Sequence, residues 1–247
     1  MNQTENQASE ALQRFIEEVH SLCLRHMSAI RAEHAAREKQ RLIADLRDNL
    51  SYRLVSVRWH YNYLCQLHRQ LDGQFLPALA AEGESTSFLL RAAHQTSFVF
   101  DDIIFNLVSC FDYIARLVGF LMLGDKAAGL KWNGLVNSAR DSGNRLLSGE
   151  FAELVVRWNR DLVNPLQKYR GDLIHRERMM GNIEGSVQFG KDTMSASVVV
   201  SVPDALAKVL TGKASFRSSE TPDVLSGAGV LIERAVGCGT ELVRATK

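Results

Sequence analysis

Residues 164–177, NPLQKYRGDLIHRE, hold the side chains best suited to chemistry. Arg170, Asp172 and His175 lie within six positions of one another. Histidine can transfer a proton near neutral pH, and the arginine fork can hold a phosphate group. Arg170 and His175 are therefore candidate catalytic residues for cutting RNA without a metal ion. The same residues could equally be three ordinary polar side chains on a helix.

Spacing alone does not decide between these two interpretations. An arginine and a histidine with four to six residues between them occur three times in the chain, at Arg14–His20, Arg53–His60 and Arg170–His175. The third occurrence differs in its surroundings. Asn164 and Pro165 form a good helix start, with a capping side chain followed by proline at the first helical position. This predicts a core helix from there to about Met180.

The elements around that helix follow from the hydrophobic periodicity. We predict helices at about 8–48, 50–79, 88–123, 130–147 and 151–163, a β-hairpin at 184–202, a short helix at 204–210 and a final helix from Thr221. Leu54, Val57, Tyr61 and Leu64 form the buried stripe of the second helix. The predicted fold is mainly α. Residues 1–80 would form a long helical hairpin packed on or extending from a helical domain at 81–247.

Two segments of this chain resemble the HEPN superfamily of helical nucleotide-binding domains. One is FDYIARLVGF, residues 111–120, and the other is NPLQKYRGDLIHRE. The likeness covers about residues 85–180. It implies a bundle of four or five helices that often dimerises, with the arginine and histidine of both protomers meeting in one cleft.

The resemblance also implies roles for the two candidate residues. His175 would act as general acid or base at the ribose 2′-hydroxyl or the 5′-oxygen, and Arg170 would hold the scissile phosphate. The products would carry 2′,3′-cyclic phosphate and 5′-hydroxyl ends. A toxin or defence role, an RNA substrate, a homodimer and an antitoxin or other protein partner are the matching expectations. Active members usually place a polar residue directly after the arginine, whereas this chain has Gly171.

Nearby carboxylates are candidate supporting residues. Asp172 lies three residues before His175 and four before Arg176, so it could orient the imidazole or pair with Arg176. Asp112 could face the candidate site, although pairing with Arg116 at i,i+4 is the favoured interpretation. Asp101 and Asp102 could face the candidate helix as buried polar partners.

A second class of function stays open. The chain could be a non-catalytic helical module that binds a partner protein or nucleic acid through the hairpin at 8–79. The densest mixture of basic and aromatic residues lies there, comprising Arg47, Tyr52, Arg53, Arg58, Trp59, Tyr61, Tyr63 and Arg69. Such a mixture could stack bases. The favoured interpretation is that the aromatic residues pack on the bundle while the arginines stay solvated.

The composition of the chain limits the kinds of binding site and the cellular location that we expect. The net charge of +1 argues against a generally basic nucleic-acid-binding surface. The cysteines, Cys23, Cys65, Cys110 and Cys238, are widely separated, which predicts buried free thiols rather than a zinc site or disulfide framework. We expect no cofactor and no metal. The N-terminus is polar and the most apolar window, 97–124, carries charged residues, so a cytoplasmic protein without a membrane span is expected.

Overall fold

The computed structural model describes residues 3–30, 36–81, 84–141, 143, 149–175, 181–190, 193–211 and 221–246. This part of the chain is mainly helical with one small antiparallel sheet, as predicted. The elements are α1 (Gln3–Ala29), α2 (Ala36–Ala80), α3 (Glu84–Leu123), α4 (Trp132–Arg140), α5 (Glu150–Trp158), α6 (Asn164–His175), β1 (Ile183–Phe189), β2 (Met194–Val200), α7 (Asp204–Thr211) and α8 (Val224–Ala245).

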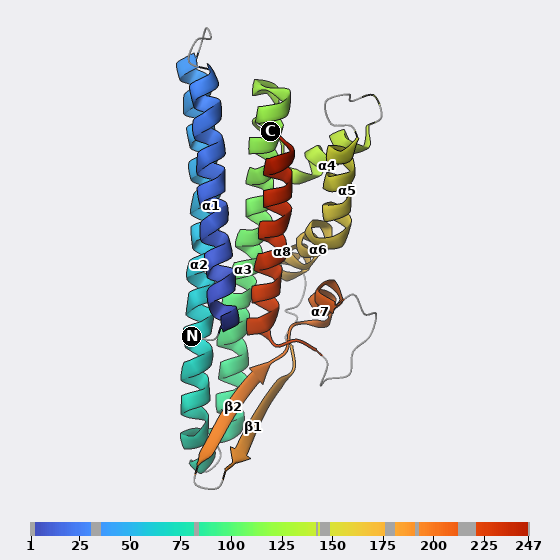
Figure 1. Ribbon diagram of the computed structural model, residues 1–247. Coiled ribbons are helices and arrows are strands. Elements are labelled where there is room, and N and C mark those ends of the chain that lie inside the picture. Colours follow the sequence, from blue (N-terminus) through green and yellow to red (C-terminus); the bar gives the residue numbers. More distant parts are fainter. Residues whose placement is uncertain are drawn as a thin grey trace.

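Four long helices set the shape of the molecule. α1, α2, α3 and α8 run side by side along its long axis, and α4, α5 and α6 lie against one side of them (Figure 1). Their buried side chains form one hydrophobic core that reaches from Ala8 in α1 to Val243 in α8. Leu54, Val57, Tyr61 and Leu64 are buried in it, which confirms the predicted stripe of the second helix.

The boundary between the first two helices was predicted in the wrong place. We expected a break near residue 49, but Asp48, Asn49 and Leu50 lie inside α2. Ile43, Leu46, Leu50 and Leu54 are buried at three- and four-residue steps, so one packed stripe runs through the predicted break. The Asn49 amide donates to the carbonyl of Asp45 and does not cap a new helix. The polar segment from Ala36 therefore begins α2 instead of ending α1.

α6 begins at Asn164, as predicted, but a π-helical turn at Asn159–Val163 joins it to α5, so Asn164 does not cap a free helix end. Asn164 has helical torsion angles, φ −61° and ψ −44°. Pro165 has no N–H to donate to the carbonyl of Asp161, and its ring disfavours the regular helical path there. The Asp161 carbonyl instead accepts from the Arg234 guanidinium of α8 at 2.9 Å. The proline thus causes a wide turn within a continuous helix.

The β-hairpin was predicted correctly. β1 and β2 pair antiparallel from Ile183 with Val200 to Phe189 with Met194. Asp72 near the end of α2 accepts the Val198 N–H at 2.8 Å, which fastens the hairpin to the lower end of the bundle (Figure 1). At the predicted final helix, the Asp223 side chain caps α8 by accepting from the Ser226 N–H. Residues 212–220, between α7 and the segment that leads into α8, lie outside the described residues.

Within the described ranges, α3 is the helix long and apolar enough to cross a membrane, and 72% of its most apolar window is buried inside the protein. A core helix of this composition matches the prediction. Gly124, with φ 78°, ends it in the left-handed region that favours glycine. All four cysteines are free and buried, as expected.

Candidate functional site

A polar contact between buried parts of the two helices fixes the candidate helix α6 to α3. The hydroxyl of Tyr169, a residue only 2% exposed, donates to Oδ1 of Asp101 at 2.9 Å. Asp101 therefore faces the candidate helix, as predicted. Asp102 does not, because its Oδ2 lies 3.7 Å from Nε2 of His60 on α2. Two adjacent carboxylates of α3 thus reach α6 on one side and α2 on the other.

The other side of α6 is open. Among the atoms that the structure describes, none lies within 4 Å of a Cβ atom added to Gly171, and Ile174 is 56% exposed. Arg170 and Asp172 are half-buried on either side of this face. Five residues of helix turn the backbone by about 140° from Arg170, which puts position 175 on the open face. The His175 side chain lies outside the part that the structure describes, as do Arg176 and the predicted helix end at Met180.

The Asp112 carboxylate accepts a hydrogen bond at the start of α4. Its Oδ1 accepts the backbone N–H of Trp132 at 3.0 Å, which satisfies a donor at the first turn of that helix. The expected partner of Asp112, Arg116, places its guanidinium 5.1 Å from the centre of the Tyr113 ring instead. Trp132 is fully buried and its Nε1–H donates to Asn159 Oδ1 at 3.0 Å. The carboxylate thus positions α4, α5 and the π-helical turn around the core.

A cavity of about 480 Å³ lies beside the beginning of α6. It is lined by Arg160, Asp161, Pro165, Ala205, Lys208, Val209 and Arg234. Three of these side chains are cationic and one is acidic. Arg160 and Asp161 bond to each other at 2.6 Å, and this contact lowers the pKa of Asp161. Sequence reasoning missed Lys208 and Arg234, because they come from α7 and α8 and no local pattern links them to α6.

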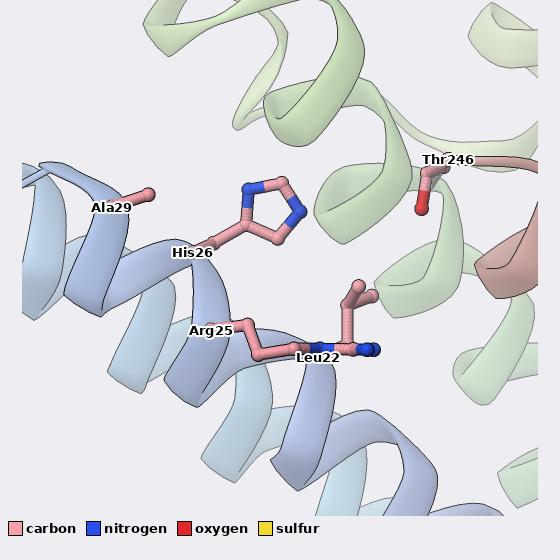
Figure 2. A pocket seen from close by; sticks show the side chains of 5 residues that line it. All are labelled: Leu22, Arg25, His26, Ala29 and Thr246. Carbon is pink, nitrogen blue, oxygen red and sulfur yellow. The ribbon is translucent and has the colours of Figure 1, made fainter.

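A smaller cavity, of about 310 Å³, lies between α1 and the end of α8. Figure 2 shows His26 and Arg25 of α1 on one side and Thr246 on the other. Partial burial, and then the charge of Arg25, lower the pKa of His26. The cavity is open and mostly apolar, and it is separate from α6. It carries no arrangement of groups that would perform chemistry.

The aromatic residues of α2 overturn one interpretation from the sequence. Tyr61 packs in the core, but Tyr52, Trp59 and Tyr63 are 68%, 61% and 42% exposed. They form a stripe on the side of α2 opposite its buried face. The expectation that the aromatic residues pack on the bundle therefore holds for Tyr61 and fails for the other three.

Among the described residues, no group of three or more His, Cys, Asp or Glu side chains could hold a metal ion. No known protein family, curated protein or solved structure matches the chain. A functional argument therefore depends on the geometry of α6 and on the exposed face of α2.

Proposed function

We propose that this chain is a HEPN-like helical protein that cuts RNA without a metal ion, with Arg170 and His175 as the reacting pair. The observation that carries the proposal is the open face of α6, where Gly171 has free space around it and Ile174 is exposed. The Tyr169–Asp101 bond holds the opposite side of the helix. Because α6 is held by α3 on one side and exposed on the side of Gly171 and Ile174, it is suited to receive a strand of RNA, a second protomer, or both.

The proposed chemistry needs only the two side chains and the ribose. His175 takes the proton of the 2′-hydroxyl or gives one to the leaving 5′-oxygen, and Arg170 stabilises the charge that develops on the phosphate. The basic cavity beside Pro165 supports the proposal, because its cations favour a phosphodiester chain approaching α6. A toxin or defence role and a homodimeric site belong to the same proposal.

A cleavage assay in EDTA tests it. Labelled single-stranded RNA is incubated with the wild type, Arg170→Ala and His175→Ala, and a DNA oligonucleotide of the same sequence is the control. We expect cleavage by the wild type alone, no cleavage of DNA, and a 2′,3′-cyclic phosphate on the product. Equal activity in all three proteins, or none in the wild type, would refute the catalytic role.

A second function is favoured by specific observations. Gly171 stands where active relatives of the resembled superfamily place a polar residue, and three aromatic side chains of α2 face solvent. These features support a non-catalytic module that binds a partner protein or nucleic acid through the N-terminal helical hairpin. Binding without cleavage in the same assay would favour this alternative.

A further inference from the structure

We infer that the outward side of α2 is a binding surface for single-stranded RNA. It is defined here as the aromatic face, comprising Tyr52, Val55, Trp59 and Tyr63. The inference deepens the proposed function and takes from it the class of substrate. All four side chains are at least 42% exposed, and they recur at three- and four-residue steps on consecutive turns. Contiguous exposed apolar side chains of this kind mark interaction sites.

The rings are arranged as a stacking platform. The Trp59 and Tyr63 rings lie parallel, with an interplanar angle of 11° and centroids 5.7 Å apart. A nucleobase can extend such a stack at its free face, whatever the base, because every base presents a planar π surface. The Arg53 guanidinium lies 5.6 Å from the centre of the Tyr52 ring and adds a cation beside the platform.

The charge of this segment complements a polyanion. Residues 49–71 contain Arg53, Arg58 and Arg69 and no aspartate or glutamate, whereas the whole chain has a net charge of only +1. Arg53 bonds to Asn106 and Arg58 to Gln13, both neutral partners, so these contacts leave the positive charges uncompensated. The carboxylate of Asp102 on α3 lies 3.7 Å from the imidazole of His60. Arg53 and Arg58 therefore offer positive charge to phosphates at the part of the aromatic face that holds Tyr52 and Trp59.

α2 and α6 contact neighbouring residues of α3. Asp101 accepts from Tyr169 of α6, and the next residue, Asp102, contacts His60 of α2. Phe98, one turn earlier on α3, is also exposed, by 59%. Single-stranded nucleic-acid sites commonly cover about 4–16 nucleotides, and the probe used below falls within this range.

Direct binding measurements test the inference on the full chain. The probe is a fluorescently labelled 2′-O-methyl RNA 12-mer, which cannot be cleaved because its 2′-hydroxyl is blocked. We expect the double substitution Trp59→Ala and Tyr63→Ala to weaken binding at least tenfold. Phe189→Ala is the matched control, because it removes an aromatic side chain that is 80% exposed at the distant hairpin. Circular dichroism verifies that both variants fold, and a fall in affinity with added salt checks the role of the arginines.

The outcomes separate this inference from the proposed function. Wild-type binding without cleavage would refute the catalytic role and leave the aromatic face as the RNA surface. Unchanged binding in the double variant, or no binding by the wild type, would overturn the inference. So would a wild-type oligomer that the double variant dissociates, because the face would then pair copies of the chain.

Discussion

The hydroxyl of Tyr169 donates to the carboxylate of Asp101 at 2.9 Å, and this bond joins α6 to the middle of α3. Tyr169 is otherwise enclosed by apolar side chains of the core. A buried phenol needs a hydrogen-bond acceptor, and Asp101 provides it at the level where α3 also contacts α2. The position of the candidate residues 170–175 thus depends on a residue that takes no part in the proposed chemistry.

Replacing Tyr169 with phenylalanine should lower the free energy of unfolding by about 1.5 kcal/mol, because a hydrogen bond to a charged group is lost inside the protein. Urea denaturation measures the change. Tyr52→Phe is the matched control, since the Tyr52 side chain is 68% exposed, and it should leave stability within about 0.5 kcal/mol. A loss of the same size in both variants would contradict a specific role for the Tyr169 hydroxyl.

Replacing Gly171 with alanine should stabilise the protein by about 0.5–1 kcal/mol. The added methyl group meets nothing within 4 Å, and alanine loses less backbone entropy in a helix than glycine does. Thermal or urea unfolding checks the sign. Gly239→Ala should do the opposite, because its Cβ would collide with the Phe15 ring. Destabilisation by Gly171→Ala would mean that the face of α6 is covered.

Replacing Asn159 with leucine should cost about 1–3 kcal/mol, since the buried Trp132 indole N–H would lose its acceptor. A double-mutant cycle with Trp132→Phe separates the energy of the Trp132–Asn159 hydrogen bond from the effect of changed packing. The two substitutions together should cost less than the sum of the single ones, because the double variant leaves no polar group unsatisfied. Additive costs would show that the bond contributes nothing to stability.

Stability should fall as the pH rises above about 9. Burial raises the pKa of the Cys23 thiol from its usual 9.0 to about 11, and it also raises the pKa values of Cys110 and Cys238. Between pH 9 and 11 the unfolded chain releases the Cys23 proton while the folded chain keeps it. The free energy of unfolding therefore falls with pH, by up to about 1.4 kcal/mol per pH unit for each such thiol. Urea unfolding of wild type and Cys23→Ala at pH 8 and pH 10 checks this. A wild-type loss no larger than that of the variant would exclude Cys23 as a source.

Strong local patterns made several elements predictable. The apolar residues of α3, the turn residues between β1 and β2, and Asp223 before α8 each gave one clear signal. The wrong boundary near residue 49 and the wrong cap at Asn164 share a cause, because polar residues and proline permit more than one backbone path. Asp48 and Asn49 stay helical because the buried stripe continues on both sides of them. Pro165 stays helical because Arg234 satisfies the carbonyl that the proline leaves without a donor.

The aromatic face shows why the site was only partly predictable. α2 carries two apolar stripes, one through Val57 and Tyr61 and another through Val55 and Trp59, and both have helical spacing. Periodicity alone does not show which stripe is buried, since that depends on which side of α2 packs against α1, α3 and α8. Asp101 illustrates the opposite case. Its place on an apolar helix indicated a buried polar partner, and Tyr169 is that partner.

The bond from Arg234 to Asp161 spans 73 positions of sequence. During synthesis on the ribosome, the turn that leads into α6 receives this contact only after the segment of α8 that carries Arg234 has emerged. The path of the chain between α5 and α6 is therefore completed late in synthesis, after α7 and the first part of α8 have been made.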